Sequence, residues 1–257
     1  RITVRALGTG AVIDSDGPDG YGVFLRNVSH VTIEGLRIVG MTARGLAHRE
    51  ATPTEPSVGL IIRDNVVQDA GAEGMYLSEV SEALIEGNEI TGSGASGADR
   101  THGIYLANAG SDRTTLRRNV IRGSGTAGIH FNGDLSIGGD GIISGLLIEE
   151  NVLQDNGQNG LNLDGVQDSV IRNNLITGNV LNGIRAYAID AAEGPRGLVI
   201  VHNTILVPVG AGWCRSMSQV RIILISSFCD TSMRFEKSFM SSRRVRVFRS
   251  STISIAC

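Results

Sequence analysis

Short runs in which apolar and polar residues alternate recur along most of this chain, and each is only a few residues long. The segments at residues 31–33, 60–62 and 198–200 are typical. Alternation over so short a stretch predicts β-strands, because successive strand side chains point to opposite faces. Glycine and asparagine residues separate the runs and predict turns between the strands.

Two sequence series repeat along the chain and interleave. In the first, an asparagine is followed two residues later by an aliphatic residue, and successive asparagines are 23 to 32 residues apart. Its members are Asn65, Asn88, Asn119, Asn151, Asn174 and Asn203. The second series reads glycine, aliphatic, any residue, large residue, and begins at Gly22, Gly45, Gly74, Gly103, Gly128, Gly160 and Gly183. Two series with the same minimum period indicate a solenoid.

The shortest repeat is long enough for three short strands and three bends. Stacked coils of this kind predict an all-β fold, a right-handed parallel β-helix with three sheets and about seven coils, over residues 1–212. A bend in every coil leaves backbone groups without a partner in their own coil. We therefore expect the asparagines of the first series to point inward and bond the backbone and their stacked neighbours, since buried polar groups need partners.

Coils longer than the shortest repeat locate insertions at residues 49–57, 95–101, 133–144 and 191–196. Loops on a rigid solenoid commonly determine specificity. We therefore expect these loops to border any binding site.

Residues 1–212 contain 15 Arg, no Lys and 24 Asp or Glu, a net charge near −9. This charge argues against nucleic acid as a partner, and no apolar run is long enough to cross a bilayer. The sequence begins inside a coil, so we expect that the true amino terminus is missing and that a signal peptide could have been lost with it. The oligomeric state is left open.

Residues 213–257 do not continue the repeat. This tail has no Gly or Asn, and contains Lys237, all three cysteines and a net charge of about +6. The favoured interpretation is a frameshifted, disordered segment beginning near Cys214. A carboxy-terminal cap and a basic partner-binding tail are the alternatives. The cysteines are too widely spaced for a metal motif.

In the glycine-aliphatic strands the two large residues point inward, so the residue between them points outward. One outward column comprises Phe24, Ala47, Tyr76, Tyr105, His130, Asn162 and Arg185, and a second comprises Ser78, Ala107, Asn132, Asp164 and Tyr187. Five coils from Tyr76 to Arg185 extend about 19 Å, which suits three or four sugar units. Tyrosine rings stack on sugars, whereas amides and arginine bond hydroxyls and carboxylates. Ordinary decoration of an exposed sheet is the alternative.

The residue types in these columns favour a lyase or C5-epimerase acting on an anionic polysaccharide. Such an enzyme neutralises a carboxylate, removes the C5 proton and supplies a proton, and arginine, histidine and tyrosine can do this. The candidate catalytic residues are His130, Tyr105, Arg185, Asp164 and His102, and the candidate substrate-binding residues are Tyr76, Asn132, Asn162 and Tyr187. A glycoside hydrolase is less favoured because it needs two flanking carboxylates, and lysine is absent from residues 1–212 as a base.

Two other functions remain open: a non-catalytic glycan-binding or cell-surface module, and a purely structural solenoid. His102 has the further alternative of bonding turn backbone. His30 and His202 are interpreted as structural, and His48 falls on an inward position.

Three glycine-rich motifs are interpreted as structural. The matches to G-x-G-x-x-G at residues 92–97 and 123–128 lie at the same repeat position and precede strands, whereas a dinucleotide site needs a following helix. The segment at residues 138–141 resembles one calcium nonapeptide, but that mechanism needs stacked copies. We therefore expect no cofactor or metal, with calcium only a weak alternative.

Five stretches, at residues 101–106, 128–134, 138–144, 162–168 and 203–206, resemble right-handed parallel β-helix repeat proteins of the pectate lyase-like superfamily. This superfamily includes pectate lyases, alginate lyases, mannuronan C5-epimerases and polygalacturonases. The resemblance implies a secreted or periplasmic protein that binds polysaccharide in a groove over one sheet. The chain lacks the Tyr-Gly-Phe-Asp-Pro-His segment of mannuronan epimerases, the polygalacturonase aspartates and a pectate lyase-type calcium cluster. The resemblance therefore implies the fold and the groove, not one activity.

Overall fold

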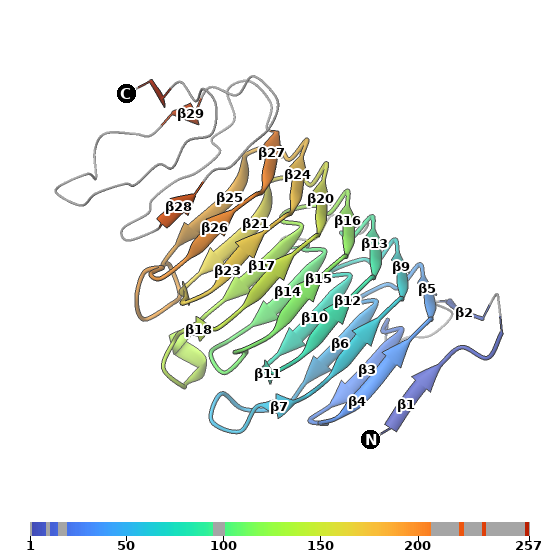
Figure 1. Ribbon diagram of the computed structural model, residues 1–257. Helices are drawn as coiled ribbons and strands as arrows, with labels where there is room; N and C mark the ends of the chain where they lie inside the picture. The colour runs from blue at the N-terminus through green and yellow to red at the C-terminus, as the bar shows by residue number, and fades with distance from the viewer. Residues whose placement is uncertain are drawn as a thin grey trace.

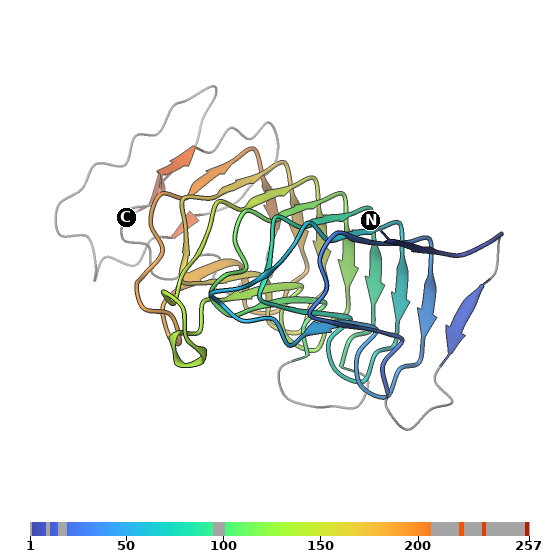
Figure 2. The same ribbon diagram turned by 90° about the horizontal axis from the view of Figure 1, so that it is seen from below.

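The structure is a computed structural model, and it describes residues 2–8, 11–14, 20–94 and 101–206 together with the backbone of three short strands near the carboxy terminus. The coils stack along one axis from the N-terminal strands to β27 (Figure 1). Figure 2 shows the same stack after a quarter turn. Most of residues 213–257, including all three cysteines, lie outside the described residues, so the expectations about this tail remain untested.

Three parallel sheets form the body. The nine-stranded sheet contains, in order, β1 (Ile2–Arg5), β4 (Val31–Glu34), β8 (Ile61–Arg63), β12 (Leu84–Glu86), β15 (Thr115–Arg117), β19 (Leu147–Glu149), β23 (Val170–Arg172), β26 (Val199–Val201) and β28 (Arg221–Ile223). The eight-stranded sheet contains β2 (Val12–Asp14), β5 (Arg37–Val39), β9 (Val66–Gln68), β13 (Glu89–Thr91), β16 (Val120–Arg122), β20 (Val152–Gln154), β24 (Leu175–Thr177) and β27 (Thr204–Leu206).

The seven-stranded sheet is the one that carries the glycine-aliphatic series. It contains β3 (Val23–Arg26), β6 (Leu46–Arg49), β10 (Met75–Ser78), β14 (Ile104–Ala107), β17 (Ile129–Asn132), β21 (Asn159–Asp164) and β25 (Asn182–Tyr187). Two-stranded pairs join β7 (Ser57–Val58) to β11 (Val80–Ser81), β18 (Ile143–Ser144) to β22 (Val166–Gln167), and β29 (Met233–Arg234) to β30 (Ile255–Ala256). A 3-10 helix, η1, spans Leu135–Ile137. The predicted right-handed parallel β-helix of about seven coils is confirmed.

The interior is filled by the aliphatic residues of all three sheets. Met75, Leu77, Ile104, Leu106 and Phe131 are fully buried, as the glycine-aliphatic pattern predicts. The glycine that opens each of these strands lies against the next coil. A Cβ on Gly103 would come within 2.3 Å of Ile121 Cγ2 and 2.6 Å of the Gly128 carbonyl oxygen, so a larger residue does not fit.

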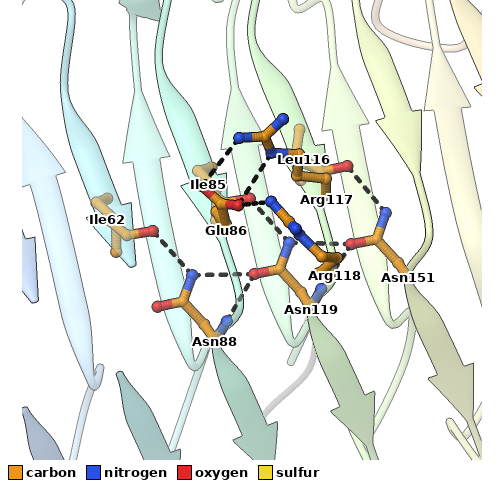
Figure 3. Close-up of polar contacts among 9 residues, drawn as sticks. All are labelled: Ile62, Ile85, Glu86, Asn88, Leu116, Arg117, Arg118, Asn119 and Asn151. Carbon is orange, nitrogen blue, oxygen red and sulfur yellow. Dashed lines mark hydrogen bonds and ion pairs between the residues drawn. The ribbon is translucent and has the colours of Figure 1, made fainter. Parts of the chain in front are cut away.

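The asparagine ladder is also confirmed, and Figure 3 shows its central part. Asn119 Nδ2 donates to the Ile85 carbonyl at 2.9 Å and to Asn151 Oδ1 at 2.9 Å. Asn119 Oδ1 accepts from the backbone N–H and Nδ2 of Asn88, at 3.0 and 2.9 Å. The same pattern joins Asn65, Asn88, Asn119, Asn151, Asn174 and Asn203. The ladder therefore satisfies the backbone at one corner of every coil it reaches.

A shorter asparagine ladder, which the sequence pattern did not reveal, lies at a second corner. Asn156 Oδ1 accepts from the Ser124 backbone N–H at 3.1 Å, and Asn156 Nδ2 donates to Asn179 Oδ1 at 2.8 Å. Asn179 Nδ2 donates to the Leu153 carbonyl at 2.9 Å. This ladder supports the coils that carry β17, β21 and β25.

A ladder of alternating charge follows the nine-stranded sheet. Stacked partners along it are Glu34, Arg63, Glu86, Arg117, Glu149 and Arg172. Ion pairs join Arg63 to Glu34 at 2.6 Å, Arg117 to Glu86 at 3.1 Å and Arg172 to Glu149 at 2.7 Å. Arg118 also contacts Glu86 (Figure 3). Each exposed pair contributes at most about 1 kcal/mol, so the ladder mainly restricts which strands can pair.

His48 lies inside the solenoid with no exposed surface. Its Nδ1–H donates to the Ser78 carbonyl at 3.0 Å, and its Nε2 accepts from Ser57 Oγ at 3.0 Å. Burial lowers the pKa of His48 below 6.5, and hydrogen bonds to the backbone of Ser78 and Val28 only partly oppose this. The interior position expected from the sequence is confirmed.

The lowered pKa of His48 predicts a loss of stability in mild acid. The folded protein binds a proton at His48 less readily than the unfolded chain, so the stability from neutral His48 is complete above about pH 6.5 and declines as the pH falls toward the folded-state pKa. Urea unfolding between about pH 5 and 8 measures this slope. The His48→Gln variant should have a lower free energy of unfolding than the wild type, and this free energy should change less with pH between about pH 5 and 8. Parallel profiles for the two proteins would contradict the assignment.

The loops at residues 49–57, 133–142 and 188–198 project along one edge of the stack (Figure 1), where the strands of the seven-stranded sheet end. The second and third of these loops contact each other: Leu135 N–H donates to the Asp190 carbonyl at 3.0 Å, and Ala192 N–H donates to the Gly141 carbonyl at 3.1 Å. These loops form a wall beside the outer face of that sheet. Residues 95–100 of the remaining predicted insertion lie outside the described part.

Candidate functional site

The two outward columns predicted from the sequence lie in register on the seven-stranded sheet. The pairing aligns Tyr76 with Tyr105, Tyr105 with His130, His130 with Asn162, and Asn162 with Arg185. The second column aligns Ser78, Ala107, Asn132, Asp164 and Tyr187 in the same way. The four candidates from Tyr105 to Arg185 therefore occupy consecutive coils of one face.

A third row of side chains lies at the start of these strands, and the sequence interpretation did not recognise it. It contains the residue that directly precedes each opening glycine: Tyr21, Arg44, Glu73, His102, Ala127, Asn159 and Asn182. The glycines bond across coils to the carbonyls of this row, for example Gly74 N–H to His102 and Gly103 N–H to Ala127. The signal was present at a fixed place in the repeat, immediately before each glycine.

Three side chains from three different coils form a hydrogen-bonded chain. His102 Nε2 lies 2.9 Å from His130 Nδ1, and His130 Nε2 lies 3.2 Å from Tyr187 Oη. The rings of His102 and His130 meet edge to face, with centroids 4.5 Å apart. Both interpretations of His102 are seen: its ring centroid lies 5.2 Å from that of Tyr105, and its Nδ1 accepts from the backbone N–H of Ala127 in a turn.

The backbone sets the direction of this chain. Ala127 N–H donates to His102 Nδ1 at 3.3 Å, and Thr126 Oγ1 lies 2.8 Å from the same nitrogen. A nitrogen that accepts from a backbone N–H carries no proton, so neutral His102 has its proton on Nε2. His102 then donates to His130 Nδ1, and His130 Nε2–H donates to Tyr187 Oη. The proton of the Tyr187 hydroxyl is left to point away from His130.

Burial raises the pKa of Tyr187 well above 10, and the nearby Asp164 carboxylate raises it further. Tyr187 is therefore a neutral phenol in the folded protein. The guanidinium of Arg185 lies over its ring, with Cζ 4.2 Å from the centroid. This contact brings the positive charge of Arg185 close to the His130 hydrogen-bonded chain, although the two strands are two coils apart.

Tyr105 lies on the other side of His130. Their ring centroids are 4.9 Å apart, and Tyr105 Oη accepts from Asn132 Nδ2 at 2.9 Å. Asn132 Nδ2 also lies 3.4 Å from Asp190 Oδ2 in the loop wall. Asp190 was not among the sequence candidates, and its place in an insertion of irregular length gave no signal beyond the expectation that loops border the site.

Two amide oxygens in the site have no hydrogen-bond partner among the described residues. They are Asn132 Oδ1 and Asn162 Oδ1, and both side chains are at most 6% exposed. Buried acceptors without a partner are costly. A donor on a bound molecule would satisfy them.

Asp164 has a different setting from the other candidates. It is 2% exposed, and its two carboxylate oxygens accept the backbone N–H groups of Ile189 and Asp190 at 2.9 and 3.2 Å. Burial raises the pKa of Asp164, more than these hydrogen bonds lower it. This carboxylate holds the loop that carries Asp190 against the sheet.

Tyr76 lies one coil before Tyr105 and contacts it edge to face, with centroids 5.4 Å apart. The guanidinium groups of Arg44 and Arg49 lie near the Tyr76 ring, with Cζ atoms 4.5 and 5.8 Å from its centroid. Tyr76 is therefore outside the histidine chain but continuous with it through Tyr105.

Family models match most of the described body. A model described as periplasmic copper-binding protein (NosD) matches residues 7–137, just over half of the chain, and one described as right handed beta helix region matches residues 97–212. The chain belongs to the NosD family of right-handed β-helix proteins. This agrees with the resemblance drawn from the repeat. No curated protein sequence matches this NosD family member.

Three solved structures are similar to this NosD family member, each with a TM-score below 0.5. The Dettilon tailspike protein (gp208) is 13% identical, with 83% of this chain and 59% of that chain covered and a TM-score of 0.45. The periplasmic alginate epimerase AlgG is 17% identical, with 87% and 57% covered and a TM-score of 0.47. The A-module of Azotobacter vinelandii mannuronan C-5 epimerase AlgE4 is 16% identical, with 73% and 64% covered and a TM-score of 0.37. This chain thus spans less than two thirds of each.

The described residues do not fit a copper centre of the kind that the NosD family description implies. Within residues 2–8, 11–14, 20–94 and 101–206, no three His, Cys, Asp or Glu side chains gather at one point. His102 and His130 are hydrogen-bonded to each other, and Met41 and Met75 are buried in the core. In the same described part, no helix has the length and apolar character needed to span a membrane.

Proposed function

We propose that this protein acts on an anionic polysaccharide as a lyase or C5-epimerase of uronate units. The observation that supports this most strongly is the directed chain from His102 through His130 to Tyr187, beside Tyr105 on the outer face of the seven-stranded sheet. His130, Tyr105 and Tyr187 are partly buried there, and His102 is buried. We further propose that it works outside the cytoplasm, secreted, in the periplasm or at the cell surface, in keeping with the family description.

Both reactions begin with the same step. A base removes the proton at C5 of a uronate, and the negative charge spreads into the carboxylate, where a cation or hydrogen-bond donor stabilises it. In a lyase the bond from C4 to its oxygen then breaks, and an acid protonates the departing oxygen. In an epimerase an acid returns a proton to C5 from the opposite face.

Tyr187 is the proposed acid. It is neutral, its hydroxyl oxygen accepts from His130, and its own proton is available for donation. After donation, the Nε2–H of His130 stabilises the phenolate. His102 keeps His130 in the tautomer that this role needs, because the Ala127 N–H fixes the acceptor nitrogen of His102.

Tyr105 is the proposed base, on the opposite side of His130 from Tyr187. Asn132 Nδ2 donates to its oxygen and would stabilise the phenolate form. Arg185 would pair with a substrate carboxylate, and Asn162 and Asn132 would accept sugar hydroxyls at their unpaired oxygens. Tyr76 would stack on a neighbouring sugar.

Hydrolysis by a pair of carboxylates is less favoured. Such enzymes place one carboxyl group on each side of the glycosidic bond. Asp164 is buried and committed to the backbone of residues 189 and 190, so we assign it a positioning role.

A non-catalytic glycan-binding module is the second candidate. It is favoured by the contact between the Tyr76 and Tyr105 rings, which offers an aromatic surface without requiring the histidines. It predicts affinity without turnover, lost on Tyr76→Ala and Tyr105→Ala.

Incubation with alginate, pectate and glycosaminoglycans tests these proposals. A lyase yields unsaturated products that absorb in the ultraviolet, and an epimerase changes the proton NMR signals of the polymer without shortening it. Binding without either change would favour the glycan-binding module. Neither binding nor turnover on the whole panel would contradict both candidates.

A further inference from the structure

Two arginines, one just before strand β6 and one at its end, approach the same aromatic ring. Arg44 directly precedes Gly45, whereas Arg49 ends the strand. Their guanidinium carbons lie 4.5 and 5.8 Å from the centroid of Tyr76 on the next coil. Ala47 lies between them and pairs with Tyr76, so no large side chain separates the two guanidinium groups from the ring.

The two arginines differ in how their charges are compensated. Arg44 forms an ion pair with the buried Glu73 at 2.7 Å and donates to Tyr21 Oη at 3.3 Å. Arg26, the residue stacked against Arg49 on the neighbouring coil, forms an ion pair with Glu50 at 3.1 Å. Arg49 is exposed, and no Asp or Glu of the described residues lies within 4.0 Å of its guanidinium.

This uncompensated charge stands out because residues 1–212 carry a net charge near −9, which repels an anionic polymer over most of the surface. Arg49 therefore offers a local attraction on the face that carries the histidine chain. A guanidinium binds a carboxylate with two parallel hydrogen bonds, and the Tyr76 ring beside it can stack on a sugar.

Tyr76 lies two coils before His130, a separation of about 10 Å along the stack. An extended polysaccharide whose reacting unit lies at His130 would place the sugar about two units away over Tyr76. Its carboxylate could then meet Arg49.

We propose that Arg49 and Tyr76 form a binding subsite for a uronate carboxylate, about two sugar units from His130. This rests on the proposed function, because the site at His130 defines where the reacting sugar lies. The subsite contributes to binding and to the choice of a charged substrate, and it takes no part in proton transfer.

Calorimetric titration of the full-length protein with hexamannuronate and hexagalacturonate, each beside its carboxyl-reduced form, tests the subsite. Arg49→Gln should weaken binding of a hexauronate about tenfold, leave the carboxyl-reduced sugar unaffected, and reduce the salt dependence of binding. Arg49→Lys should recover part of the affinity. The control is Arg122→Gln, an exposed arginine on the eight-stranded sheet, which should bind as the wild type does.

Turnover separates this inference from the proposed function. In an active protein Arg49→Gln should raise KM with little change in kcat, since the lost contact is the same in the ground and transition states. Wild-type turnover with unchanged hexauronate affinity in Arg49→Gln would overturn the subsite alone, as would an equal loss for charged and reduced sugars. Arg49-dependent binding without turnover would support the subsite and overturn the enzymatic proposal. No binding of either hexauronate would overturn the subsite.

Discussion

Replacing His130 with alanine is expected to lower kcat on a uronate polymer about 10²–10⁴-fold, the usual contribution of a positioned proton-transfer group. Tyr187 would lose the donor at its hydroxyl oxygen, and His102 would lose its acceptor. Tyr187→Phe should reduce kcat to a similar extent, because it removes the proposed acid itself. Because both act on one proton transfer, the double variant should be little worse than either single variant.

The matched control is His30→Asn. His30 is exposed in a turn before β4, at a positive φ that asparagine tolerates. Strand β4 belongs to a different sheet from the site. It should retain wild-type kcat and KM. Steady-state kinetics on the best polymer of the panel provide the comparison, with thermal unfolding to confirm that each variant is folded. Full kcat in both His130→Ala and Tyr187→Phe would contradict the mechanism.

Replacing Asn119 with alanine is expected to lower the free energy of unfolding by about 3–5 kcal/mol. The change removes four buried hydrogen bonds and leaves the Ile85 carbonyl and the Asn88 backbone N–H without partners. Asn119→Asp should be at least as damaging, since the oxygen that replaces Nδ2 would face the Ile85 carbonyl and Asn151 Oδ1.

Denaturant titration followed by circular dichroism measures this loss. Glu89→Ala is the control, since Glu89 is exposed in β13, the strand directly after ladder residue Asn88, and should change stability by less than about 0.5 kcal/mol. A ladder interrupted in mid-stack should also broaden the transition, because each coil of a solenoid is stabilised mainly by its neighbours. An Asn119→Ala protein as stable as the control would show that the ladder is not a main source of stability.

The sequence predicted the fold because the repeat places the same residue type at the same point of every coil. The inward asparagines were expected from the unpaired backbone at each bend, and the ladder hydrogen bonds confirm them. The outward position of Tyr105, His130 and Arg185 follows from strand alternation, and the sheet pairing aligns them. Alternation predicts the face of the sheet on which a side chain lies, but not the direction in which a long side chain extends along the stack of coils. It therefore did not predict that Tyr187 reaches back two coils to His130.

Other parts of the site depend on contacts that have no period. Asp164 was placed correctly in its column, but its burial comes from the backbone of residues 189 and 190, which belongs to a loop of irregular length. Asp190 entered the site for the same reason. His102 lies outside the strand pattern, and its tautomer depends on one backbone N–H of the next coil. The repeat pattern could not predict these features, because they depend on contacts that do not recur from coil to coil.

The alternating charges from Glu34 to Arg172 bear on how such a chain can gain or lose repeats. Removing one coil from the middle would bring two carboxylates or two guanidinium groups face to face, for example Glu34 beside Glu86, and like charges opposite one another are unfavourable. Removing two neighbouring coils would restore an opposite pair. Coils would therefore be gained or lost most easily two at a time, because only an even number preserves the alternation of charge on this sheet. Recombination that changes the number of coils would be subject to the same restriction.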